Sequence, residues 1–292
     1  MRDLIDTFGE KNMMEIQSID VLLEKGVRIF LIDASGVLYT DEGIVPGAKE
    51  AVKRIQSVTE DIFLVTNNTS LSPDGIHRYL HNKGVAIPIA NILSSGFGLS
   101  WDPEINRLIQ NKKVYVYGWD SSEFYVIHAG GECVSDIKDA EVIVVLASFQ
   151  DGNEEEVQKI TAFLNQNPER EIICANPDRY VMGTEGLLPV CGYYAEKIES
   201  QISQKMHWIG KPHDNFSLGV KAFLEEERGL CLSEETTCFF DDNLDNVNSM
   251  SRIVSISGTI ITETGLYQEK GLRAQWDSRL TKCHYSLKKF SV

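Results

Sequence analysis

Four polar clusters each follow an apolar run of the chain, and their side chains could do chemistry together. They are Asp33 with Ser35, Thr66 with Asn67 and Asn68, Gly210 with Lys211, and Asp241 with Asp242. In open α/β sheets, ligands bind just beyond the carboxyl ends of the strands. One such cluster is weak evidence, because strands must end in polar loops, but four of them predict a ligand site. The excess of acidic residues makes a divalent-cation site easy to supply.

Alternating apolar runs and amphipathic stretches would position these clusters. We predict strands at 27–33, 61–68, 90–96, 114–118, 140–148, 171–176, 236–242 and 252–261, and helices at 46–58, 72–84, 153–166 and 216–229. In the second helix Ser72 is the expected N-cap, Pro73 takes the first helical position and Gly84 ends the helix. Continuous apolar strands that alternate with helices predict an α/β fold with a parallel sheet covered on both faces.

Composition limits the classes of function. The 292 residues, 42% of them hydrophobic, suit one large or two ordinary domains with a sizeable core. The net charge of -15 argues against nucleic acid and anionic membranes as partners. We find no apolar run long enough to span a membrane and no signal-peptide pattern at the N-terminus. Six cysteines without metal-ligand spacing are expected as free thiols, which indicates a cytoplasmic protein.

The four clusters, in this order, resemble the motifs of the haloacid dehalogenase superfamily, from about residue 27 to 265. "LVTNNTS", "ANPDRY", "TEGLLPVCG" and "IGKPHDNF" resemble stretches of its NagD-like (class IIA) subclass. "DASGVLY" resembles the phospholysine/phosphohistidine inorganic pyrophosphate phosphatases, which also carry Ser two places after the Asp. The resemblance implies a Rossmann-like parallel sheet core formed by residues 1–98 and 206–292, with an inserted α/β cap domain at 99–205.

The resemblance also assigns roles to residues. It implies that Asp33 is a nucleophile that forms an aspartyl phosphate and that Lys211 pairs with it. Mg²⁺ would be held by Asp33, the carbonyl of Ser35, and Asp241, with Asp242 or Asp245 in support. The substrate contacts would come from Gly36, Thr66, Asn67 and Asn68 in the core, and from Asn176, Asp178 and Arg179 in the cap. Thr66, Asn67 and the Asn-Pro-Asp segment also suit plain turns, and this alternative stays open.

Three departures from the family pattern bear on activity. Ser35 stands where most family phosphatases carry an Asp that protonates the leaving group, Phe240 replaces a Gly, and Asn246 falls where a later Asp is usual. A Ser hydroxyl is a poor acid near pH 7, so we expect a slow, Mg²⁺-dependent phosphatase acting on a small phosphorylated, pyrophosphate or phosphoramidate substrate. The alternative is a catalytically weak or inactive phosphatase-like binding protein.

Two further interpretations concern surfaces. A homodimer through the cap is one interpretation of how the protein assembles. The stretch from Leu272 to Phe290 is more basic than the rest of the chain, and we expect either a helix packed on the core or a partner-binding tail.

Overall fold

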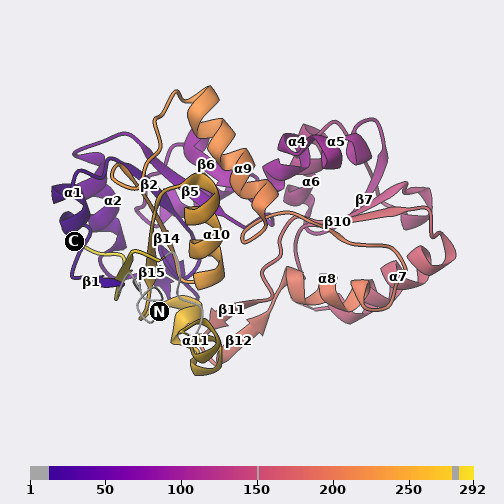
Figure 1. Ribbon diagram of the computed structural model, residues 1–292. Coiled ribbons are helices and arrows are strands. Elements are labelled where there is room, and N and C mark those ends of the chain that lie inside the picture. Colours follow the sequence, from indigo (N-terminus) through magenta and orange to yellow (C-terminus); the bar gives the residue numbers. More distant parts are fainter. Residues whose placement is uncertain (1–12, 150, 278–282) are drawn as a thin grey trace, which may run out of the picture.

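A seven-stranded parallel sheet forms one half of the molecule (Figure 1). The structure is a computed structural model that describes residues 13–149, 151–277 and 283–292. The strand order is β1-β16-β15-β14-β2-β5-β6. The strands are β1 (Met14–Ile16), β2 (Ile29–Ile32), β5 (Ile62–Thr66), β6 (Ile92–Ser94), β14 (Thr237–Asp241), β15 (Ser257–Ile261) and β16 (Tyr285–Leu287).

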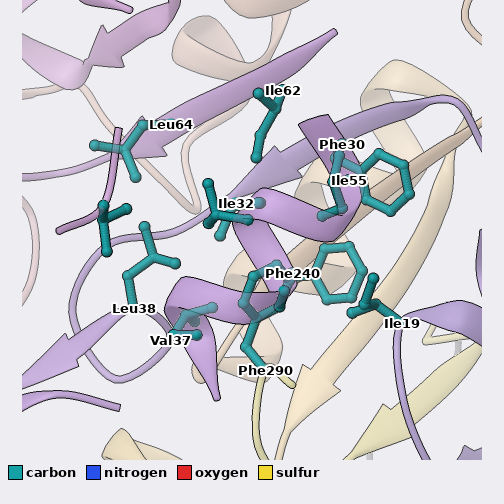
Figure 2. Close-up of a cluster of buried hydrophobic side chains, with 14 of the residues drawn as sticks. Ile19, Phe30, Ile32, Val37, Leu38, Ile55, Ile62, Leu64, Phe240 and Phe290 are labelled. Carbon is teal, nitrogen blue, oxygen red and sulfur yellow. The ribbon is translucent and has the colours of Figure 1, made fainter. Parts of the chain in front are cut away.

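Both faces of this sheet are buried, and alternate residues of each strand supply the two faces. One face packs Phe30, Ile32 and Phe240 with α1 (Asp20–Glu24), α2 (Ala48–Gln56) and α3 (Pro73–Asn82) (Figure 2). The other packs Leu31 and Phe239 with α9 (Asp214–Ala222) and α10 (Leu244–Val254). This double burial explains why the strands read as continuous apolar runs.

A second, five-stranded parallel sheet has the order β13-β10-β9-β7-β8. Its strands are β7 (Lys113–Tyr117), β8 (Glu132–Val134), β9 (Val142–Val145), β10 (Glu171–Cys174) and β13 (His207–Trp208), and its cluster of apolar side chains includes residues of α7 (Asn153–Gln166) and α8 (Cys191–Glu199). Between β10 and α8, the antiparallel hairpin of β11 (Tyr180–Gly183) and β12 (Gly186–Pro189) points back toward the larger sheet (Figure 1). The predicted fold class is confirmed, and the domain boundaries at 98/99 and 205/206 stay an interpretation.

Several local predictions are confirmed. Helix α7 spans the predicted 153–166, and α3 begins at Pro73, with the Ser72 hydroxyl accepting a hydrogen bond from the Gly75 N–H at 3.3 Å. Gly84 has a φ of +83°, which ends the helix region as expected. All six cysteines are free thiols. Among the helices of the described residues, none is long and apolar enough to cross a bilayer.

One strand prediction near the C-terminus is wrong. The stretch from Arg252 to Val254 was expected to open a strand, but it ends α10, and β15 begins only at Ser257. The apolar spacing of Val247, Met250 and Val254 is helical, and it buries one side of α10 against the sheet.

The basic stretch after Leu272, for which a packed helix and a partner-binding tail were both left open, contains part of a helix and a strand. Part of it continues α11 (Lys270–Asp277), residues 278–282 lie outside the described part, and β16 adds a parallel strand to β15. The N-terminal segment, on which the signal-peptide expectation depends, lies largely outside the described residues as well.

Candidate active site

The carboxyl ends of β2, β5 and β14 bring three of the four clusters to one edge of the larger sheet. Strand β2 lies between β5 and β14, and Ile32 pairs in register with Phe240. The backbone N–H of Asp33 donates to the Phe240 carbonyl at 2.8 Å. Asp33 and Asp241 therefore leave adjacent strands side by side, because parallel strands end at the same edge.

Lys211, from the segment after β13, joins these carboxylates. Its Nζ lies 2.6 Å from Asp33 Oδ1, 2.7 Å from Asp241 Oδ2 and 2.9 Å from the Val65 carbonyl. The side chain is only 1% exposed. Burial alone would lower the pKa of Lys211, but Asp241 and Asp33 raise it above its usual value, so the ammonium stays charged.

Three buried carboxylates form a potential metal site. One oxygen each from Asp33, Asp241 and Asp242 lies within 4.8 Å of the others. Burial raises the pKa of Asp33 to about 7, against the opposing effect of Lys211 and with a smaller contribution from Asp241. Burial, followed by Asp241 and Asp33, raises the pKa of Asp242 well above its usual value. A divalent cation would relieve this repulsion, and carboxylate oxygens are the ligands that Mg²⁺ and Ca²⁺ prefer.

Asn246 adds a second observation in favour of a cation. Its Nδ2 donates to Asp241 Oδ2 at 3.2 Å, while its Oδ1 is buried and has no hydrogen-bond partner among the described residues. A buried acceptor without a donor is uncommon, and its oxygen suits a ligand to a cation. The amide thus occupies the place of the expected carboxylate without adding a charge, and the donor set fits a divalent metal.

Asp242 is fixed by close backbone contacts. Its Oδ2 accepts a hydrogen bond from the Leu266 N–H at 2.5 Å. A Cβ on Gly36 would lie 2.3 Å from that oxygen, and one on Gly265 closer still, so only glycine fits at both positions. Gly36, predicted to touch the substrate, is thus in close contact with Asp242.

The departure at Phe240 has a structural explanation. Its side chain is fully buried, with its ring centroid 6.2 Å from that of Phe30 and 5.1 Å from that of Phe290 (Figure 2). The ring therefore fills the hydrophobic core on the face of the sheet, while the following Asp241 faces the site. The replacement of Gly by Phe thus places no bulk among the carboxylates.

The polar side chains after β5 mainly form hydrogen bonds with other groups of the protein. The Asn67 Nδ2 donates to Asp178 Oδ1 and to the Lys211 carbonyl, both at 2.8 Å, and its Oδ1 accepts from the Lys211 N–H at 2.9 Å. Both amide hydrogens are therefore engaged. The Thr66 hydroxyl accepts from the Asn68 N–H at 3.1 Å, and Asn68 Oδ1 accepts from Ser70. Direct phosphate contacts from Thr66, Asn67 and Asn68 stay predictions.

Of the predicted cap residues, Asp178 alone joins the carboxylates. It is half-buried, and burial raises its pKa to about 6, against the opposing effects of Lys211 and Asn67. Asn176 accepts a hydrogen bond from the Asp178 N–H at 3.3 Å and so shapes the turn. The exposed Arg179 pairs with Glu196 of α8 at 2.9 Å. Their substrate contacts also stay predictions.

A cavity of about 20 Å³, the catalytic pocket, lies among these groups. Core residues Asp33, Ser35, Asp241 and Asp242 line it together with Asp178 and, from the hairpin, Tyr180, Val181 and Met182. Such a volume has room for water but not for a phosphorylated substrate, so the hairpin covers the site closely. The sequence analysis missed the hairpin, although "YVMGTEGLLP" places two apolar runs around a Gly-containing turn.

Comparison with known proteins agrees with this geometry. A family model described as a haloacid dehalogenase-like hydrolase matches residues 30–132. The chain is 23% identical over 261 residues to the 4-nitrophenylphosphatase of Schizosaccharomyces pombe, which covers 83% of this chain and 85% of that protein. It is 25% identical over 186 residues to the ribonucleotide monophosphatase NagD of Escherichia coli, covering 64% and 70%. The crystal structure of a possible sugar phosphatase from Cytophaga hutchinsonii superposes with a TM-score of 0.80 at 21% identity, covering 96% of this chain and 99% of that one.

The chain is thus similar to the haloacid dehalogenase-like hydrolases, both in the matched residues 30–132 and in its relatives. Its relatives and structural neighbours include NagD and 4-nitrophenylphosphatases, so the expected resemblance to NagD-like phosphatases is confirmed. The narrower resemblance of "DASGVLY" to the Ser-bearing phosphatases stays a prediction.

Proposed function

We propose that the chain is a Mg²⁺-dependent phosphatase in which Asp33 is the nucleophile. The observation that carries this proposal is the position of Asp33, a buried carboxylate 2.6 Å from the Lys211 ammonium and beside Asp241 and Asp242. Such a group is poised to attack phosphorus once a phosphate joins the cluster. Relatives named as phosphatases support the same reaction class.

The reaction proceeds in two displacements. An Asp33 carboxylate oxygen attacks phosphorus, the bond from phosphorus to the leaving group breaks, and an aspartyl phosphate forms. Water then attacks that phosphorus, its protons pass to solvent and phosphate, and the Asp33 carboxylate is released. Lys211 neutralises negative charge on Asp33 and on the phosphoryl oxygens, since phosphoryl transfer depends mainly on positioning and electrostatics.

The metal would be held by Asp33, Asp241, the Ser35 carbonyl and Asp242, with the Asn246 Oδ1 as an additional oxygen. When bound, Mg²⁺ would neutralise phosphate charge and hold the phosphoryl group in line with the nucleophile. The hairpin and Asp178 exclude bulk water from the same space.

Ser35 restricts the substrates. Without a carboxylic acid at this position, the leaving group must depart with little proton transfer. General acid–base catalysis by a side chain typically raises the rate about 10²–10⁴-fold. Small substrates with good leaving groups, such as pyrophosphate, phosphoramidates and aryl phosphates, should therefore react better than alkyl phosphates. The activity of the 4-nitrophenylphosphatase relative on an aryl phosphate is in line with this. The competing function is an inactive phosphate-binding protein, which Ser35 and Asn246 favour.

A panel of substrates tests the proposal. Purified protein is assayed for phosphate release from pyrophosphate, imidodiphosphate, acetyl phosphate and p-nitrophenyl phosphate, with Mg²⁺ and with EDTA. We expect Mg²⁺-dependent release that Asp33→Asn abolishes. Hydrolysis of none of the four, together with phosphate binding, would favour the inactive binding protein instead.

A further inference from the structure

A larger cavity adjoins the catalytic pocket on the cap side. This outer pocket has a volume of about 430 Å³, within the range of small-molecule sites. Asp178, Tyr180, Asn243 and Leu266 line both cavities. Because these shared residues stand beside the carboxylates, a group departing from phosphorus has this volume to occupy.

Three of the described residues that line the outer pocket carry aromatic rings. The Trp208 and His213 rings lie nearly parallel, at an interplanar angle of 13° with centroids 6.0 Å apart, and Tyr180 lines the same cavity. Trp208 is held in place by its Nε1, which donates to Glu199 Oε2 at 3.3 Å. Burial lowers the pKa of His213, so its ring is neutral at pH 7. Such faces favour stacking with another flat ring.

The charges around the outer pocket are mostly negative. Four carboxylates line it, from Asp178, Glu196, Glu199 and Asp245. Arg179 is the one Lys or Arg among the residues that line the cavity, and its Nε already pairs with Glu196 at 2.9 Å. An anionic leaving group would be repelled here, whereas a cationic one would be attracted.

We propose that the outer pocket binds the leaving group of the substrate and selects a flat aromatic group that is neutral or positively charged. This inference rests on the proposed phosphatase function and narrows its substrate class. It agrees with Ser35, because a phenol or heteroaromatic leaving group departs without a strong acid. Among the substrates with good leaving groups, this ranks aryl phosphates and cationic phosphoramidates above pyrophosphate, whose leaving group is a second, anionic phosphate.

A charge-matched series of substrates tests the selection. The three are 4-(aminomethyl)phenyl, 4-(hydroxymethyl)phenyl and 4-(carboxymethyl)phenyl phosphate, in which a methylene group insulates the phenol from the charge. We expect kcat/KM to fall at least about tenfold from the cationic to the anionic compound at low ionic strength. The ratio should shrink at about 0.5 M salt, where exposed charges are screened.

Variants connect the selection to the pocket. Glu199→Gln removes a charge and keeps one of the two oxygens that accept from the Trp208 Nε1 and the Met206 N–H, so the cationic-to-anionic ratio should narrow about threefold. Trp208→Ala should raise KM for all three compounds because the stacking face is lost. The matched control is Glu155→Gln, an exposed carboxylate of α7 outside the pocket, and it should keep the full ratio.

The outcomes separate this inference from the phosphatase proposal. Equal kcat/KM for the three compounds, or a ratio that Glu199→Gln leaves unchanged, overturns the leaving-group assignment while the phosphatase stands. No hydrolysis of the aryl series, with acetyl phosphate still cleaved, overturns it as well. Hydrolysis of all substrates by Asp33→Asn would instead overturn the phosphatase proposal.

Discussion

The side-chain amide of Asn67, at the end of β5, donates a hydrogen bond to Asp178 of the cap loop at 2.8 Å. The same amide forms two hydrogen bonds with the backbone of Lys211. Its Nδ2 donates to the carbonyl at 2.8 Å, and its Oδ1 accepts from the N–H at 2.9 Å. One core residue therefore positions both a cap carboxylate and the lysine that pairs with Asp33. This link connects the position of Asp178 to that of Lys211 and hence to the charge balance of the site.

Asn67→Ala tests this link. We expect kcat/KM to fall about 10–100-fold because Asp178 and Lys211 are no longer held in position by hydrogen bonds. The free energy of unfolding should fall by about 1–3 kcal/mol, because buried partners are left unsatisfied. Steady-state kinetics and urea unfolding measure the two effects. Asn165→Ala, which removes only an exposed amide bond to Gln201, is the control, and matching kinetics for the two variants would contradict the role of Asn67.

Lys211→Met removes the cation between two carboxylates. Leaving Asp33 and Asp241 buried without a counter-charge should cost about 3–5 kcal/mol in the free energy of unfolding at pH 7. Hydrolysis should become undetectable, and added Mg²⁺ should recover part of the stability because it binds the folded cluster. Exposed Lys205→Met serves as the control. A Lys211→Met protein as stable as the wild type in EDTA would rule out this charge balance.

The metal-free protein should lose stability as pH rises. Burial raises the pKa of Asp33 to about 7 and that of Asp178 to about 6, whereas unfolded carboxyls ionise near pH 4. Between these values the folded state binds more protons than the unfolded chain, so the free energy of unfolding decreases from about pH 4 to 7. Mg²⁺ should offset the loss at pH 7.

Thermal unfolding in EDTA at several pH values, repeated with Mg²⁺, measures this dependence. In Asp178→Asn the part of the decrease that falls between about pH 4 and 6 should disappear. Stability that rises through this range without metal, and does not respond to Mg²⁺, would be the opposite of the expected behaviour.

Ser35→Asp should restore a proton donor beside Asp33. Because general acid catalysis is typically worth about 10²–10⁴, we expect a gain of at least tenfold in the hydrolysis of an alkyl phosphate, with a much smaller change for acetyl phosphate. The ratio of the two rates in wild type, Ser35→Asp and Ser35→Ala is the measurement. If the alkyl ester gains nothing, the explanation of substrate preference by leaving group fails.

Most of the site's framework follows from the sequence. Asp33, Thr66 and Asp241 each end a buried parallel strand, and the fold rule that ligands meet such ends brings them to one edge of the sheet. Lys211 is less obvious, because it lies in a loop, and only its resemblance to a family motif singled it out. The contact of its ammonium with both carboxylates depends on tertiary packing that no local pattern encodes.

The misses have physical causes. The end of α10, Arg252–Val254, was read as strand because β15 follows it closely and apolar residues recur from Ile253 to Ile261. Asn243 is the N-cap of α10, and its Oδ1 accepts a hydrogen bond from the Asp245 N–H at 3.0 Å. The sequence analysis missed this N-cap because it treated the surrounding acidic residues only as metal ligands. The engagement of Asn67 by Asp178 connects residues 111 positions apart, which only a folded structure reveals. The cytoplasmic location and the cap-mediated homodimer stay predictions.

The most direct test of the account is to identify the residue that carries the phosphoryl group during turnover. The protein is incubated with acetyl phosphate and Mg²⁺, quenched, and treated with borohydride, which reduces an aspartyl phosphate to homoserine. Peptide mass spectrometry should find homoserine at position 33, and none in Asp33→Asn or in EDTA. Homoserine at another aspartate, or phosphate release with Asp33 unmodified under every quench time, would contradict the assignment of Asp33 as the nucleophile.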